Sequence, residues 1–176
     1  MHTKQTLIAL LLGVACATSA QAECLSDAQA DDLAAHYLAR TPAANLEGLS
    51  DADGACTRAK FNARIAPRLG KVVGYKAGLT NPAVQKRFNH DAPLRGTLFK
   101  KMLVSDGAEL PAGYGTRPVF EADLLVEVAD PHALAEAQTP LAALKALKRY
   151  APFIELPDLM VDDPSRHVGQ MLAMIN

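Results

Sequence analysis

Apolar residues recur at helical spacing early in the chain and at strand spacing later. A capping box formed by Ser26 and Gln29 predicts a first helix over residues 26–40, with Leu33, Tyr37 and Leu38 on its apolar side. Residues 56–69 repeat the helical pattern, and this second helix is expected to bury Phe61, Ile65 and Leu69.

The rest of the chain mixes short strand and helix signals. In order, the patterns predict a strand (71–78), a short helix capped by Thr80 or Asn81 (82–88), two strands (97–104 and 117–129), a helix (139–149), a brief buried strand (152–156) and a last helix (164–175). Helices come first and strands later, without regular alternation of the two. The fold class predicted is therefore α+β.

Residues 1–22 have the layout of a secretory signal peptide. Lys4 gives a charged start, residues 7–15 form a short apolar run, and Ala20-Gln21-Ala22 is a small-residue cleavage site. The run is too short to span a bilayer, because a transmembrane helix needs about 20 apolar residues. We therefore expect a periplasmic or secreted protein whose residues 23–176 form one domain.

Charge and cysteine content narrow the partners and the compartment. A formal net charge of −1 gives no basic surplus for nucleic acid, and no later apolar run predicts a membrane span. Of the three cysteines, only Cys24 and Cys56 would remain after cleavage. In an oxidising compartment they are expected to form a disulfide, and two free thiols are the alternative.

Three carboxylates lie in apolar, strand-forming stretches. Glu121 and Asp123 are two residues apart, so a strand places both on one face, and Glu155 follows in residues 153–156. Neighbouring carboxylates repel unless a positive group lies between them, and hard divalent cations such as Mg²⁺ or Mn²⁺ prefer oxygen ligands. In the alternative, Glu121, Asp123 and Glu127 form only the solvated face of an antiparallel strand. The apolar side chains that alternate with them then point inward, namely Ala122, Leu124, Val126 and Val128.

Lys76 is a candidate acid or base. It lies between Gly74 and Gly78, which leave the backbone open to a substrate, and partial burial lowers the pKa of an ammonium. The helix start after Gly78 offers backbone N–H groups to an anionic carboxylate. The alternative is an ordinary solvated lysine near a turn.

Five segments together resemble the 2-keto-4-pentenoate hydratase family, which includes 4-oxalocrotonate decarboxylases and belongs to the fumarylacetoacetate hydrolase superfamily. The matching segments are residues 74–80, residues 84–85, Pro93 with Gly96, residues 121–123 and residues 153–158. They occur in the family's order and spacing, and the resemblance covers roughly residues 60–176.

The resemblance implies a mixed β-roll, which we expect to be incomplete because family members extend further. It also implies a lyase that hydrates a small 2-hydroxydienoate or 2-oxo acid through a metal-stabilised enolate, with a homo-oligomer as a further expectation. The implied roles are Lys76 as catalytic residue, Gly78, Leu79 and Thr80 as substrate-binding residues, and Glu121, Asp123 and Glu155 as ligands of Mg²⁺ or Mn²⁺.

Two residues depart from the family pattern. Asp123 stands where a glutamate is usual, and Leu94 stands where an acidic residue is frequent. A non-catalytic or vestigial protein that keeps the chelating pocket is therefore the alternative function.

Overall fold

The structure, a computed structural model, describes residues 23–163 and 168–174, so the predicted signal peptide lies outside the described residues. Its elements are α1 (Asp27–Ala39), α2 (Asp51–Leu69), β1 (Val72–Gly78), α3 (Pro82–Arg87), β2 (Leu94–Phe99), the 3₁₀ helix η1 (Lys100–Met102), β3 (Glu121–Val128), α4 (Pro131–Glu136), α5 (Pro140–Lys145), β4 (Leu147–Glu155) and α6 (Val168–Met174). The predicted mixture of helices and strands is confirmed. None of the helices among these residues is both long and apolar enough to cross a membrane.

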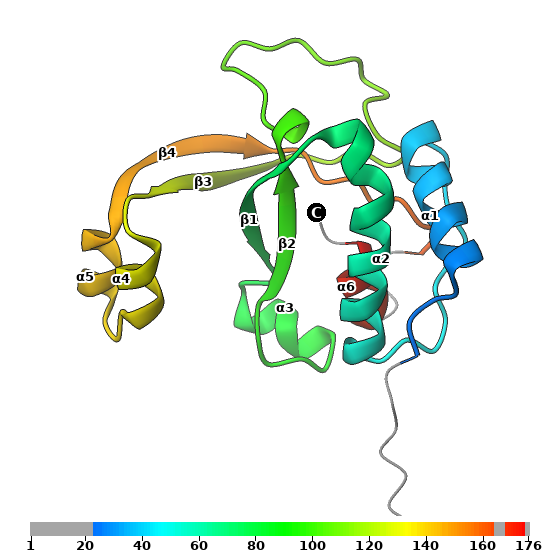
Figure 1. The fold of residues 1–176 in the computed structure, drawn as a ribbon, viewed down its shortest axis with the longest axis horizontal. Coiled ribbons are helices and arrows are strands. Elements are labelled where there is room, and N and C mark those ends of the chain that lie inside the picture. The colour runs from blue at the N-terminus through cyan, green and yellow to red at the C-terminus, as the bar shows by residue number, and fades with distance from the viewer. Residues whose placement is uncertain (1–22, 164–167, 175–176) are drawn as a thin grey trace, which may run out of the picture.

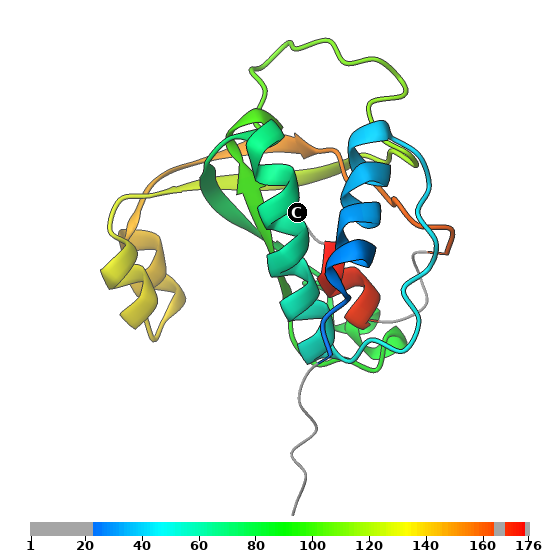
Figure 2. The same ribbon diagram turned by 45° about the vertical axis from the view of Figure 1, so that its right-hand side comes forward.

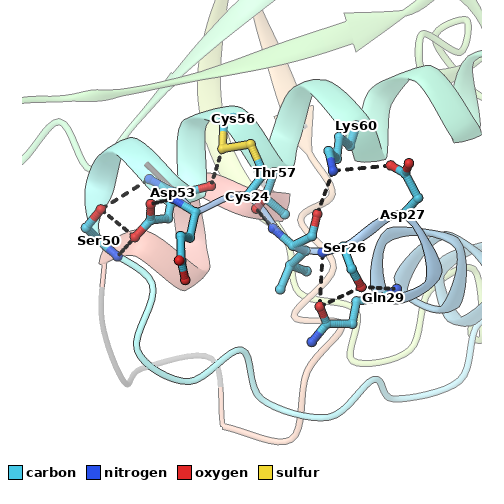
Figure 3. Close-up of a disulfide and its surroundings, with 11 residues drawn as sticks. Cys24, Ser26, Asp27, Gln29, Ser50, Asp53, Cys56, Thr57 and Lys60 are labelled. Carbon is cyan, nitrogen blue, oxygen red and sulfur yellow. Dashed lines mark hydrogen bonds and ion pairs between the residues drawn. A yellow bond between two sulfur atoms is a disulfide. The ribbon is translucent and has the colours of Figure 1, made fainter. Parts of the chain in front are cut away.

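Capping boxes set the start of both long helices. The first begins after Ser26, as predicted, but α2 begins at Asp51, five residues before the predicted start. The reason is a second box, in which the Asp53 N–H donates to Ser50 Oγ (3.2 Å) and the Ser50 N–H donates to Asp53 Oδ2 (2.9 Å), as Figure 3 shows.

A disulfide joins Cys24 to Cys56 beside this helix start, with 5.4 Å between their Cα atoms (Figure 3). Two hydrogen bonds hold the same segment against α2. The Leu25 N–H donates to Thr57 Oγ1 (3.1 Å), and Lys60 Nζ donates to the Leu25 carbonyl (2.8 Å). The chain before α1 is therefore fixed to α2 both covalently and by hydrogen bonds.

Helix α2 lies between α1 and α6 on one side and the β1–β2 hairpin on the other (Figures 1 and 2). Phe61 and Ile65 are fully buried, as predicted, and the Tyr37 ring meets Phe61 edge-on at 5.5 Å. Leu38 was wrongly placed on the buried side, since its side chain is 43% exposed. The core cluster consists of Leu33, Ala34, Ala43, Phe61, Ile65, Phe99, Met160 and Val161.

Helices α2 and α6 cross at two glycines. A Cβ added to Gly54 would overlap the carbonyl oxygen of Gly169 and lie 2.8 Å from the Cβ of Leu172. A Cβ on Gly169 would lie 2.8 Å from the Ser50 carbonyl oxygen. The crossing therefore depends on the missing side chains, and residues 164–167 and 175–176 of the predicted last helix lie outside the described part of the chain.

The strands form two separate antiparallel hairpins. In the first, Gly78 pairs with Leu94 and Val72 with Phe99, so β2 lies earlier than the predicted 97–104, and the chain enters η1 after Phe99. In the second, Glu121 pairs with Glu155. The predicted strand 117–129 was too long at both ends, because β3 runs only from Glu121 to Val128.

The β3–β4 hairpin projects from the helices as an arm with α4 and α5 at its tip (Figures 1 and 2). The predicted helix 139–149 was wrong beyond Lys145, because its last residues belong to β4, where Lys148 and Arg149 each bind Glu127 at 2.6 Å. The brief buried strand 152–156 was also wrong, because β4 covers Leu147–Glu155 and is largely exposed. Helix α4 was not predicted.

Candidate functional site

A cavity of ≈ 300 Å³ lies where the end of β1 meets the base of the arm. Its lining comes from three segments far apart in the sequence. These residues are Lys76, Ala77, Gly78, Leu79, Thr80, Glu121, Ala122, Asp123, Glu155 and Pro157. The structure thus brings all seven residues of the predicted catalytic, substrate-binding and metal-ligand sets to one cavity.

Lys76 is held in place by a carboxylate. It lies on β1 opposite Gly96, which has no side chain to cover it, and its Nζ forms an ion pair with Glu155 Oε1. The two side chains are only 18% and 16% exposed. Lys76 is therefore not a freely solvated lysine, and its ammonium group is directed into the cavity by Glu155.

The pairing of β3 with β4 places Glu121 and Asp123 beside this ion pair. Glu121 is the register partner of Glu155, and Asp123 lies two residues further on the same face of β3. One oxygen of Asp123 accepts a hydrogen bond from the backbone N–H of Leu124 at 2.7 Å. Glu127 lies beyond the cavity, where Lys148 first and then Arg149 lower its pKa.

The alternative, a half-buried strand with a solvated carboxylate face, required the apolar residues on the opposite face of β3 to be buried. They are not buried. Leu124 is 63%, Val126 48% and Val128 38% exposed. The arm thus exposes apolar side chains on the face that the pattern had predicted to be inside.

The donor atoms suit a hard divalent cation, because three carboxylates surround one cavity. Among the residues that the structure describes, however, no three Asp, Glu, His or Cys side chains are gathered closely enough to hold a metal ion. Glu155 is engaged by Lys76 and Asp123 by a backbone N–H. A cation would therefore have to take Glu155 from Lys76.

A tight turn after β1 forms the other wall of the cavity. Leu79 has a left-handed backbone (φ 52°), and its carbonyl accepts a hydrogen bond from Nε2 of the buried Gln85 at 2.8 Å. Asn81 caps α3 by accepting from the Ala83 N–H (2.8 Å). No role was predicted for Gln85 from the sequence, although residues 84–85 form one of the segments that resemble the family.

Asp158 supports the entry to β3 and was also missed. Its two carboxylate oxygens accept hydrogen bonds from the Thr116 N–H (3.0 Å) and the Arg117 N–H (2.8 Å). Next to it, the Val119 N–H donates to the Pro157 carbonyl at 3.0 Å. These bonds fix the backbone that leads into Glu121, so Asp158 positions the site without lining it.

Comparison with known proteins gives matches to enzymes of one kind, although no family model matches the chain. A 2-keto-4-pentenoate hydratase from Burkholderia vietnamiensis is 36% identical over 93 residues, and hydratase 1 from Dechloromonas aromatica is 31% identical over 116 residues. The chain is a partial homologue of the 2-keto-4-pentenoate hydratases. The two matches cover 53% and 65% of this chain but only 35% and 44% of those relatives, so the chain spans less than half of their length.

A solved structure shares the fold. The 4-oxalocrotonate decarboxylase from Pseudomonas putida G7, complexed with magnesium and adipate, superposes with a TM-score of 0.69 at 22% identity. The match covers 85% of this chain and 59% of that one. The same enzyme complexed with calcium and acetate gives a TM-score of 0.65. The chain thus shares the fold of this decarboxylase over most of its own length.

Proposed function

We propose that this protein is an exported, metal-dependent, hydratase-like lyase acting on a small 2-hydroxydienoate or 2-oxo acid. The observation that carries the proposal is the cavity in which Lys76 is paired with Glu155, with Glu121 and Asp123 beside them. Homology to hydratases over about half of the chain supports the same chemistry.

Glu121, Asp123 and Glu155 would hold the metal ion. Magnesium is the first candidate, because carboxylate oxygens suit it and because the related decarboxylase binds magnesium. Bound there, the ion would supply Lewis-acid stabilisation of the negative charge that develops on the substrate's 2-oxygen. Mn²⁺ has the same ligand preference and is the second candidate.

Lys76 would move the proton. Its Nζ lies in the cavity, and its small exposure gives it a fixed direction toward a bound molecule. Within the described part of the chain, no backbone hydrogen bond is formed by the N–H groups of Leu79 and Thr80, which line the same cavity. They are available to a substrate carboxylate, and Gly78 beside them leaves room for it.

The direct test is turnover of 2-keto-4-pentenoate with Mg²⁺, followed by the loss of dienol absorbance and by mass analysis of the product. We expect addition of water by the wild-type chain and a loss of at least about 100-fold in kcat for Lys76→Met, the range assigned to a positioned acid or base. Lys148→Met is the matched control, because it also removes a lysine that binds a glutamate, but outside the cavity. No turnover by wild type, or equal losses in both variants, would contradict the proposal.

A non-catalytic protein that retains the chelating pocket is the second candidate. It is favoured by Leu94, a buried side chain (4% exposed) at a position where the family often has an acid. Binding of Mg²⁺ and of 2-oxo acids without proton exchange or water addition would support this candidate. Exchange of the substrate's C3 protons in D₂O separates the two, because only the enzyme catalyses it.

Export is part of the proposal, and the disulfide between Cys24 and Cys56 supports it, since such bonds persist in oxidising compartments. Expression of the chain from its own first residue, followed by cell fractionation, tests it. We expect the protein in the periplasmic fraction, with the intact mass of a chain that begins at Glu23. Cytoplasmic protein of full-chain mass would contradict export.

A further inference from the structure

Gln85 is a buried polar side chain whose amide reaches the turn beside the cavity. It lies on α3, and its Nε2 donates a hydrogen bond to the carbonyl of Leu79 at 2.8 Å. Leu79 and Thr80 line the cavity, but Gln85 does not. Gln85 therefore contacts this wall of the site from behind, and it acts on a bound molecule only through the backbone of the turn.

Leu79 needs such support because of its backbone conformation. Its φ of 52° lies in the left-handed region, which is unfavourable for a residue with a Cβ atom. A conformation of this kind persists only where the surrounding structure enforces it. The bond from Gln85 restrains Leu79 on one side, and the pairing of Gly78 with the buried Leu94 restrains the turn on the other.

Gln85 is itself anchored to the rest of the protein. Its backbone carbonyl accepts hydrogen bonds from the N–H groups of Phe88 and His90, both at 3.0 Å. The Nδ1 atom of His90 lies 3.3 Å from Asp51 Oδ2 at the start of α2. Because Gln85 is tied in this way to a helix of the core, its side chain can hold the turn in place.

The conformation of Leu79 determines where two N–H groups point. The N–H groups of Leu79 and Thr80 belong to consecutive peptide units, and successive N–H groups in a turn form a concave site for an anion. Rotation of Leu79 out of the left-handed region would turn the peptide unit that carries the Thr80 N–H. The two donors would then no longer converge on one carboxylate.

We propose that Gln85 is a positioning residue, which holds Leu79 in the left-handed conformation and thereby aims the N–H groups of Leu79 and Thr80 at the carboxylate of a bound 2-oxo acid. This inference rests on the proposed function, because it assumes that such an acid binds in the cavity. It assigns Gln85 to the affinity for the acid and not to the affinity for the metal, since the three carboxylates of the cavity come from β3 and β4.

The test is a double-mutant cycle on the binding of 2-oxopentanoate, measured by isothermal titration at saturating Mg²⁺ with the chain expressed from its own first residue. This acid has no carbon–carbon double bond that could take up water, so binding is measured without turnover. Gln85→Met removes the donor and keeps a long unbranched side chain. Leu79→Gly removes the need for the donor, because glycine adopts the left-handed conformation freely.

Gln170→Met is the matched control, because it also replaces a buried glutamine, but on α6 and outside the lining of the cavity. Far-UV circular dichroism verifies that each variant folds. A second measurement needs no variant: in ¹⁵N spectra of the wild type, the amide signals of Leu79 and Thr80 should shift when 2-oxopentanoate is added.

We expect Gln85→Met to weaken the binding of 2-oxopentanoate by about 5- to 10-fold, the factor that one neutral hydrogen bond supplies. In the Leu79→Gly background the same change should cost less than about twofold. The affinity of Gln85→Met for Mg²⁺ alone, and that of Gln170→Met for the acid, should stay within about twofold of wild type, because neither change reaches the groups concerned.

Equal costs of Gln85→Met in both backgrounds would overturn the proposal, because Gln85 would then act independently of the conformation of Leu79. An unchanged affinity in Gln85→Met, or amide signals of Leu79 and Thr80 that do not respond to the acid, would overturn it as well. A wild type that binds Mg²⁺ but not 2-oxopentanoate would overturn this proposal and leave the metal site standing. A wild type that binds neither would contradict the proposed function itself, and this inference with it.

Discussion

Replacing Lys76 by methionine should strengthen metal binding while it abolishes turnover. In the structure, the Lys76 ammonium forms an ion pair with the carboxylate of Glu155, which a bound cation would need as a ligand. Methionine has a similar length but no charge, so Glu155 becomes available and a positive charge next to the ion disappears. Loss of a catalytic side chain usually weakens a site, so the opposite sign of this effect is diagnostic.

The magnitude follows from the ion pair. A hydrogen bond between charged groups contributes about 1.5–3 kcal/mol net, and the low exposure of both side chains (18% and 16%) leaves little solvent screening to reduce it. Each 1.4 kcal/mol is a factor of ten in affinity, so we expect Mg²⁺ to bind about 10- to 100-fold more tightly. Without metal, Glu155 is left unpaired, and the fold should lose about 1–3 kcal/mol.

Isothermal titration of Mg²⁺ into metal-free wild type, Lys76→Met and Lys148→Met measures the effect. Lys148 binds Glu127 on the same arm but outside the cavity, so its variant should keep wild-type affinity within about twofold, the size expected for an exposed pair. Equal or weaker binding by Lys76→Met would refute the competition between lysine and cation for Glu155.

Three further predictions concern the scaffold. Gly54→Ala should lower the free energy of unfolding in urea by about 1–3 kcal/mol because α6 must move away, whereas Gly113→Ala, with nothing within 4 Å, should change it by less than about 0.5 kcal/mol; equal effects would contradict the close helix crossing. Burial, and then the charge of Asp158, raises the pKa of Tyr37 above 10.0. The folded protein therefore favours the neutral phenol, so the stability that Tyr37 contributes is complete below pH 10 and is lost as the pH rises through the folded-state pKa. Spectrophotometric titration should therefore show a tyrosine that ionises later than free tyrosine, and Tyr37→Phe should remove that step. Reduction of the disulfide should cost about 3–4 kcal/mol for its separation of 32 residues and lower the Tm by roughly 10 °C, an effect that should be absent from the Cys24→Ser/Cys56→Ser double variant.

Local signals in the sequence foretold the elements whose causes are local. The box at Ser26 marked the start of α1, and Asn81 with the following Pro82 marked the start of α3. The burial of Phe61 and Ile65 followed from helical spacing. The second capping box at Ser50 is of the same local kind, so the early start of α2 was also readable.

Elements whose conformation depends on residues far away in the sequence could not be predicted from local patterns. Residues 140–149 have a helical composition, yet the last of them join β4 because β3 pairs with them and Glu127 binds Lys148 and Arg149. The exposure of Leu124 also has no local cause, since alternation tells which residues share a face but not whether that face is covered. Assembly of Lys76 with Glu155, 79 residues later, came from the family resemblance, and the ion pair between them came only from the structure.

The most direct test of the central claim, that the cavity binds a divalent cation through its carboxylates, is a thermal-melt titration with Mg²⁺ of wild type, Glu155→Gln and Glu127→Gln. Glu127 lies on the same strand face as Glu121 but outside the cavity, which makes it the matched control. At 100 times the Kd, binding to the folded state contributes about 2.7 kcal/mol, which raises the Tm by roughly 5–10 °C. The account predicts this rise for wild type and Glu127→Gln and its loss in Glu155→Gln, whereas a wild-type melt indifferent to Mg²⁺, or a rise that survives Glu155→Gln, would contradict it.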